Sequence, residues 1–80
     1  MSRIVQRPIR IHRWRNGKPL CFSDGPVVHR VREVIDSWSE MGNWWDGEGG
    51  RTMLRVWTDA EAAFDLECVE ERWFIYRIWD

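Results

Sequence analysis

Two histidines and two cysteines are the residues of this 80-residue chain best suited to nucleophilic chemistry or metal binding. They are His12, Cys21, His29 and Cys68. Zinc is usually held by four such ligands in closely spaced pairs, and the spacing here fits no zinc-finger pattern. Nothing in the sequence brings a base beside either thiol. We therefore expect buried free thiols, no metal site and no cofactor.

Other catalytic signals are incomplete. Asp36 and Glu40 could face each other, but paired carboxylates are common on protein surfaces. The run Gly47-Glu48-Gly49-Gly50 lacks the lysine and the following helix of a phosphate-binding loop. The core of so short a chain needs its seven tryptophans, which leaves little room for an active-site cleft. We expect a protein that is not an enzyme.

The charge is distributed unevenly along the chain. Residues 1–32 hold eight basic residues and one acid, whereas residues 33–80 hold four basic residues and twelve acids. The two parts therefore carry about +7 and −8, a split typical of nucleic-acid binding or of charge-steered docking. In the alternative interpretation, the two parts are neighbours in a sheet and their charges pair across strands.

Two predicted strands place their basic residues on one surface. Arg10, His12 and Trp14 alternate along the first strand, and Arg30 and Arg32 alternate along the third. Such a surface with an aromatic residue on it would suit a phosphate backbone. The alternative is an ordinary solvated face balanced by acids of the second half. Those acids are Glu61, Asp65 and Glu67.

A glycine-rich loop over residues 42–50 carries two adjacent tryptophans, Trp44 and Trp45. Such a loop is a poor place to store two large rings, so the pair predicts a contact site for a base or a protein partner. Alternatively, one of the two rings folds back to cap the sheet. The complete predicted binding set is Arg10, Arg13, Trp14, Arg30, Arg32, Trp44 and Trp45.

The elements that must position these residues are strands. Alternating apolar residues and tight turns predict a single all-β domain over residues 1–80, a six-stranded antiparallel meander curled into a small barrel or half-barrel. Asn16-Gly17 and Asp24-Gly25 are typical of two-residue hairpin turns. The predicted strands cover residues 4–14, 18–23, 26–41, 51–58, 61–68 and 72–80.

The predicted strands at residues 27–41 and 72–80 depart from simple alternation of apolar and polar residues. Residues 27–41 also have helical spacing, which leaves an α+β fold with a helix there as the alternative. Their β-branched residues favour a strand with a bulge near Glu33-Val34. Residues 72–80 are apolar on both faces, with Ile75 and Ile78 on opposite sides, so we expect a central strand.

Several spaced residues resemble a known family over about residues 7–80. They include Trp38, Trp44-Trp45, Arg51, Trp73 and the closing Arg77-Ile78-Trp79-Asp80. In these the chain resembles a small bacterial domain of uncharacterised function that accompanies Y-family polymerase-like proteins of the mutasome, the inducible translesion-synthesis machinery. The closing motif of that domain usually ends in Tyr-Asp, and its strand after the residue equivalent to Asp59 usually follows a glycine turn.

The resemblance brings no catalytic residues. It implies an accessory module of bacterial DNA repair or translesion synthesis that binds DNA or a DNA-bound polymerase-complex protein. The alternative is a protein-interaction module or homo-oligomer without nucleic-acid contact. No apolar segment follows Met1 and no run approaches a membrane span, so we expect a cytoplasmic protein without membrane contact.

Overall fold

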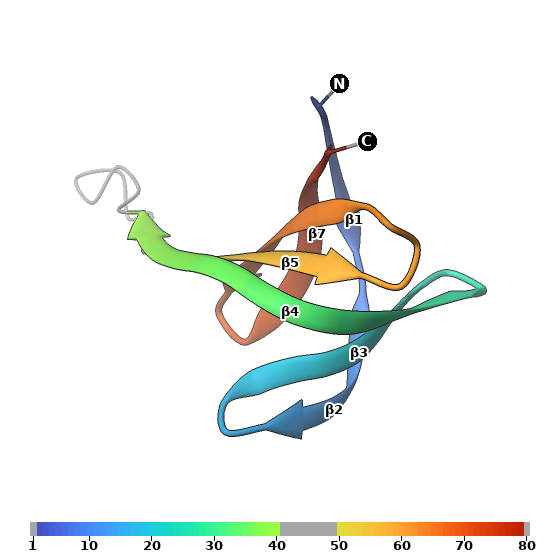
Figure 1. The fold of residues 1–80 in the computed structure, drawn as a ribbon. Coiled ribbons are helices and arrows are strands. Elements are labelled where there is room, and N and C mark those ends of the chain that lie inside the picture. The colour runs from blue at the N-terminus through green and yellow to red at the C-terminus, as the bar shows by residue number, and fades with distance from the viewer. Residues whose placement is uncertain (1, 41–49, 80) are drawn as a thin grey trace.

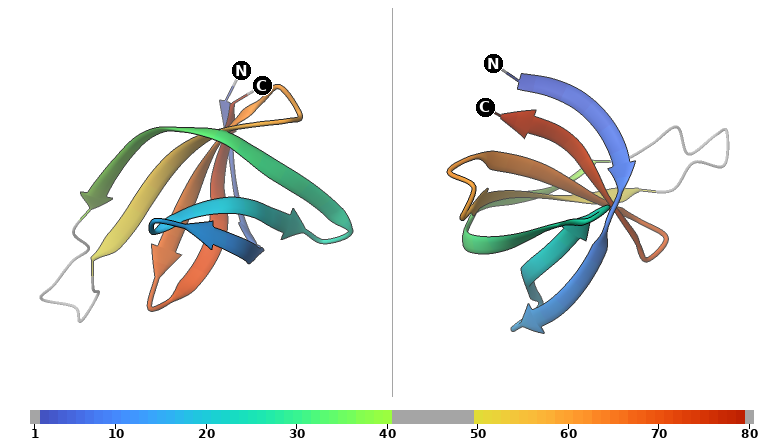
Figure 2. Two further views of the ribbon diagram at one scale, coloured as in Figure 1. Left: turned by 60° about the horizontal axis from the view of Figure 1, so that its bottom comes forward. Right: turned by 90° about the vertical axis from the view of Figure 1, so that its right-hand side faces the viewer.

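The structure, a computed structural model, describes residues 2–40 and 50–79. These residues form one antiparallel sheet in the order β1-β7-β6-β5-β4-β3-β2, which curls into a half-barrel (Figures 1 and 2). The all-β half-barrel is therefore confirmed. Its strands are β1 (Ser2–Pro8), β2 (Arg10–Arg15), β3 (Lys18–Asp24), β4 (Val27–Glu40), β5 (Arg51–Thr58), β6 (Ala63–Val69) and β7 (Arg72–Trp79).

The described strands number seven because the predicted first strand is two strands. Pro8 has no N–H to donate to a ladder and ends β1, and Ile9 leaves the strand, although its N–H donates to the Trp73 carbonyl at 3.0 Å. The chain then continues as β2 on the opposite edge of the sheet, as Figure 2 shows. One bent segment thus supplies both edges.

The tight turns follow the local sequence. Asn16 and Gly17 both have positive φ, 51° and 77°, as a type I′ turn requires. The second hairpin differs from our expectation, since Asp24 still pairs with Val27 and the turn is Gly25-Pro26. Only Gly25 needs a positive φ (60°), because the proline ring restricts φ to negative values, as in a type II′ turn.

The helical alternative for residues 27–41 is wrong, because β4 is a strand from Val27 to Glu40. Its pairing with β5 shifts between Val31 and Glu33 and again between Val34 and Asp36. These irregularities confirm the bulge expected near Glu33-Val34. Each extra residue interrupts strict alternation, and this interruption gives the sequence its helix-like spacing.

The last strand is central, as predicted, with β7 lying between β1 and β6. Its expected alternation fails at one point. Ile75 pairs with Leu66 and Arg77 with Asp65, which leaves Tyr76 as an extra residue. Ile75 and Ile78 therefore both belong to the core instead of lying on opposite faces.

The hydrophobic core fills the concave side of the curled sheet. Its buried members come from β3, β5, β6 and β7: Phe22, Leu54, Val56, Phe64, Leu66, Ile75 and Ile78. Burying a large apolar side chain contributes about 1.5–3 kcal/mol. The core leaves two regions for other uses: the opposite face of β4 to β7, and the surface where β2 meets the start of β7.

Candidate nucleic-acid interface

A groove of about 540 Å³ lies between β2 and the start of β7. Its aromatic walls are Trp14 and Trp73, whose ring centroids are 5.4 Å apart at an angle of 55°. Trp14 is 48% exposed, so part of its indole is available to a ligand. The groove is within the size range of small-ligand sites, and an exposed indole offers a stacking surface for a base.

Two arginines and one carboxylate give this groove its charge. Arg10 comes from β2, Glu71 from the β6–β7 turn and Arg72 from the first position of β7. In the described part of the chain, no salt bridge forms to Arg10 or Arg72. Both guanidinium groups can therefore meet a phosphate, while Glu71 opposes one.

A second hollow, of about 360 Å³, shares Pro8, Ile9 and Arg10 with the groove. Its other lining residues are His12, Ser23 and Gly25. The His12 Nε2 atom and the Ser23 Oγ atom share a hydrogen bond of 2.9 Å, with the donor set by the imidazole tautomer. Arg10 therefore stands between an aromatic groove and a polar hollow.

The pairing register brings three predicted binding residues to one face. Arg13 of β2 and Arg30 of β4 both pair with Cys21 of β3, and Arg10 pairs with Ser23, two residues further along β3. Because positions two apart on a strand share a face, these three arginines lie on one face, with Arg13 and Arg30 about 10 Å apart. Within residues 2–40 and 50–79 none of the three forms a salt bridge.

The other predicted residues lie elsewhere. Arg32 is the extra residue where the β4–β5 register shifts, and it lines a separate hollow with Arg15, Lys18 and Glu33. The register shift at Arg32 interrupts the strict alternation with Arg30 that the sequence predicts. Residues 44 and 45, the predicted tryptophan pair, lie outside the described residues.

Two of the three acids that could have balanced the basic surface, Asp65 and Glu67, are bound to arginines of their own half. Arg55 of β5 donates to Asp65 through Nε at 2.8 Å and Nη2 at 3.3 Å. Arg51 bridges Glu40 and Glu67. Asp65 and Glu67 are 3% and 7% exposed, so both carboxylates are buried against the arginines that neutralise them. The alternative in which these two acids answer the N-terminal arginines is therefore wrong.

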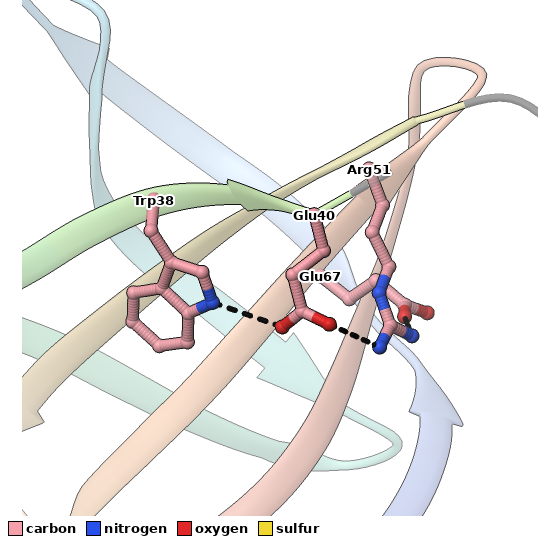
Figure 3. A network of polar contacts seen from close by, with 4 residues as sticks. All are labelled: Trp38, Glu40, Arg51 and Glu67. Atoms are coloured by element: carbon pink, nitrogen blue, oxygen red, sulfur yellow. Dashed lines mark hydrogen bonds and ion pairs between the residues drawn. The ribbon is translucent and has the colours of Figure 1, made fainter. Parts of the chain in front are cut away.

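Figure 3 shows the network of polar contacts that joins Trp38, Glu40, Arg51 and Glu67. The Trp38 Nε1 donates to Glu40 at 2.9 Å, and the Arg51 Nη2 donates to the same carboxylate at 2.7 Å. The hydrogen bond from Arg51, and then that from Trp38, holds the pKa of Glu40 below its ordinary value. The hydrogen bond to Asp65 raises the pKa of Arg55, whose guanidinium also lies over the Trp38 and Trp79 rings.

The remaining reactive side chains have structural surroundings. His29 packs against Phe22 and Phe64, with ring centroids 5.2 and 5.0 Å away. Cys21 and Cys68 are free thiols, as expected, although half-buried instead of buried. Burial raises the pKa of Cys68, which makes its thiolate harder to form.

Two residues of the groove, Arg72 and Trp73, are not among the binding residues predicted from the sequence. Ser23, which lines the neighbouring hollow, is not among them either. The adjacent Arg72 and Trp73 at the start of the last strand are a sequence signal that could have indicated a binding site. Their proximity to β2, however, depends on the curl that brings the two edges of the sheet together.

Comparisons of the chain with protein-family models, with curated proteins and with solved structures give no match. In the part of the chain that the structure describes, no helix is long and apolar enough to cross a membrane.

Proposed function

We propose that this chain is a non-enzymatic module that binds single-stranded nucleic acid as an accessory of bacterial DNA repair or translesion synthesis. The observation that carries the proposal is the half-exposed Trp14 against Trp73, with Arg10 and Arg72 lining the same groove. Aromatic rings that accept a base, next to cations that accept phosphate, are the two components of single-strand binding sites.

The charge distribution supports a polyanionic ligand despite the net charge of −1. Arg10, Arg13 and Arg30 share a face and form no salt bridge with described residues. The arginines of β5, in contrast, form salt bridges with buried carboxylates. The repair and translesion setting comes from the family resemblance, and the contribution of Trp44 and Trp45 from the sequence alone.

The test is fluorescence anisotropy with a labelled 12-nucleotide oligothymidine and a duplex of equal length, each at two salt concentrations. We expect the single strand to bind more tightly and its affinity to fall steeply with salt. Replacing Trp14→Ala should weaken binding by about 5- to 150-fold, since stacking contributes about 1–3 kcal/mol per base.

The matched control is Trp57→Ala, which removes an indole of similar exposure, 37%, from β5. It should leave the affinity unchanged. Absence of single-strand binding at low salt, or an equal loss in the Trp57 and Trp14 variants, would refute the proposal. Glu71→Gln should tighten binding, because it removes a carboxylate that lines the groove.

A second candidate, a protein-interaction module or homo-oligomer, is favoured by exposed aliphatic residues on β4. Val27, Val28 and Ile35 are 50%, 58% and 50% exposed. Light scattering across a concentration series separates the two candidates. A stable dimer that Val28→Ser dissociates, with no affinity for oligothymidine, would favour this second function.

A further inference from the structure

We infer that the site takes a short segment of single strand, with one base on Trp14 and the two phosphates next to it at Arg10 and at the His12–Ser23 hollow. This inference rests on the proposed function and specifies how the strand runs. Its basis is that the groove and the hollow are adjacent and share the Pro8–Arg10 segment. A ligand leaving one enters the other beside the Arg10 guanidinium.

The chemistry changes along this path. The groove offers the apolar surfaces of Ile9, Ile11 and Trp14, which suit a base. The hollow offers an imidazole and a hydroxyl whose polar atoms are 2.9 Å apart, which suit a phosphate oxygen. A repeating ligand that alternates flat rings with phosphates matches both chemistries in order.

The acid nearest to the hollow in sequence is held in an ion pair. Asp24 follows Ser23, but its carboxylate is bound by Arg7 at 2.7 Å and is neutralised there. Gly25 lines the hollow and contributes no side chain to fill it.

The same hydrogen bond could suggest a nucleophile activated by a base. A third group that orients the imidazole is the usual companion of such a pair. The closest carboxylate in sequence, Asp24, is engaged by Arg7 instead. The His12–Ser23 pair lies beside Arg10, which forms no salt bridge with described residues, and therefore favours anion binding over covalent chemistry.

The test compares thymidine dinucleotides without a terminal phosphate, with a 5′-phosphate and with a 3′-phosphate, by NMR titration of the isotope-labelled protein. We expect one of the two terminal phosphates to tighten binding by about tenfold, as a charge-assisted hydrogen bond would. The amides of Arg10, His12 and Ser23 should shift most on its addition. Inorganic phosphate alone should bind much more weakly.

Variants test whether the affinity gained from the terminal phosphate comes from the hollow. The double variant His12→Ala, Ser23→Ala should abolish the gain from the terminal phosphate and keep the affinity for the bare dinucleotide. Arg10→Ala should weaken the binding of both the bare and the phosphorylated dinucleotide. Lys18→Ala, which removes one charge at the β2–β3 turn, should preserve the affinity gained from the terminal phosphate.

The outcomes separate the two proposals. If 12-nucleotide oligothymidine binds but neither terminal phosphate adds affinity, the path through the hollow is wrong and the proposed function stands. If inorganic phosphate binds as well as the phosphorylated dinucleotide, the hollow is a simple anion site and the inference is wrong. If oligothymidine does not bind at all, the proposed function is wrong, and the inference with it.

Discussion

Two regions of this sheet use the same residue types, arginine and tryptophan, in opposite ways. On β4 to β7, Arg51 and Arg55 are bound to carboxylates and covered by aromatic rings. On β2 to β4, Arg10, Arg13 and Arg30 have no such partner in the described part of the chain.

The difference shows that an arginine beside a tryptophan is not by itself a binding signal. Whether such an arginine is available for binding depends on whether a neighbouring strand supplies a carboxylate directly opposite it. Asp65 pairs directly with Arg55 along the β5–β6 ladder, whereas Cys21 lies between Arg13 and Arg30. We therefore expect variants of the first region to change stability and variants of the second to change binding.

The largest stability effect should come from Arg55→Ala. This change leaves the carboxylate of Asp65, whose side chain alone is 4% exposed, without its cation, and we expect a loss of about 3 kcal/mol in the free energy of unfolding. Urea denaturation measures it. Adding Asp65→Asn should restore part of the loss, and a loss no larger than that of Arg13→Ala would erase the distinction between the two regions.

Arg51→Ala should have a smaller effect of the same kind. Its two carboxylates differ in exposure, with 9% for Glu67 and 40% for Glu40, so one of them can be solvated when the guanidinium is removed. We expect a loss of about 1–2 kcal/mol, measured in the same way. Glu67→Gln should cost less than Arg51→Ala, because it leaves no unpaired charge buried.

In the second region, Arg13→Ala should change unfolding by less than about 0.5 kcal/mol, since the side chain is exposed and forms no salt bridge with described residues. It should nevertheless weaken oligothymidine binding and reduce the slope of log affinity against log salt by about 0.7. Anisotropy at several salt concentrations measures the slope. An unchanged slope would remove Arg13 from the interface.

The smallest effect concerns pH. Because the pKa of Glu40 in the folded state is lowered from 4.5, its contribution is present above that value and is lost as the pH falls through the lowered pKa. Glu40→Gln should therefore be less stable than the wild type at pH 6, by less than about 1 kcal/mol, and the difference should shrink towards pH 3. Glu33→Gln, an exposed change in the same strand, is the control. A difference that stays constant with pH would contradict the assignment.

Local chemistry made much of the fold predictable. Asn16-Gly17 specifies its turn, and the β-branched residues of 27–40 outweigh their helical spacing once a bulge is allowed. The failures come from non-local geometry. Pro8 marks the end of β1, but the crossing of the chain to the opposite edge and the extra residue at Tyr76 depend on how strongly the sheet curls, which no short stretch of sequence reports.

The candidate site divides in the same way. Arg10 and Trp14 could be predicted because both lie on one short, basic strand. Their neighbours Trp73 and Arg72 lie almost sixty residues later in the chain and meet them only through the closed arrangement of β2 and β7. The His12–Ser23 contact joins two strands of a hairpin, but the irregular register there hides it from a simple alternation rule.

The pairing of the first strand with the last has a consequence for the order of assembly. The hairpins from β2 to β6 connect neighbours in the chain and can form early, whereas β1 pairs only with β7 in the part of the chain that the structure describes. Because β1 and β7 lie far apart in the sequence, we expect the docking of residues 2–8 to be the slowest step of folding.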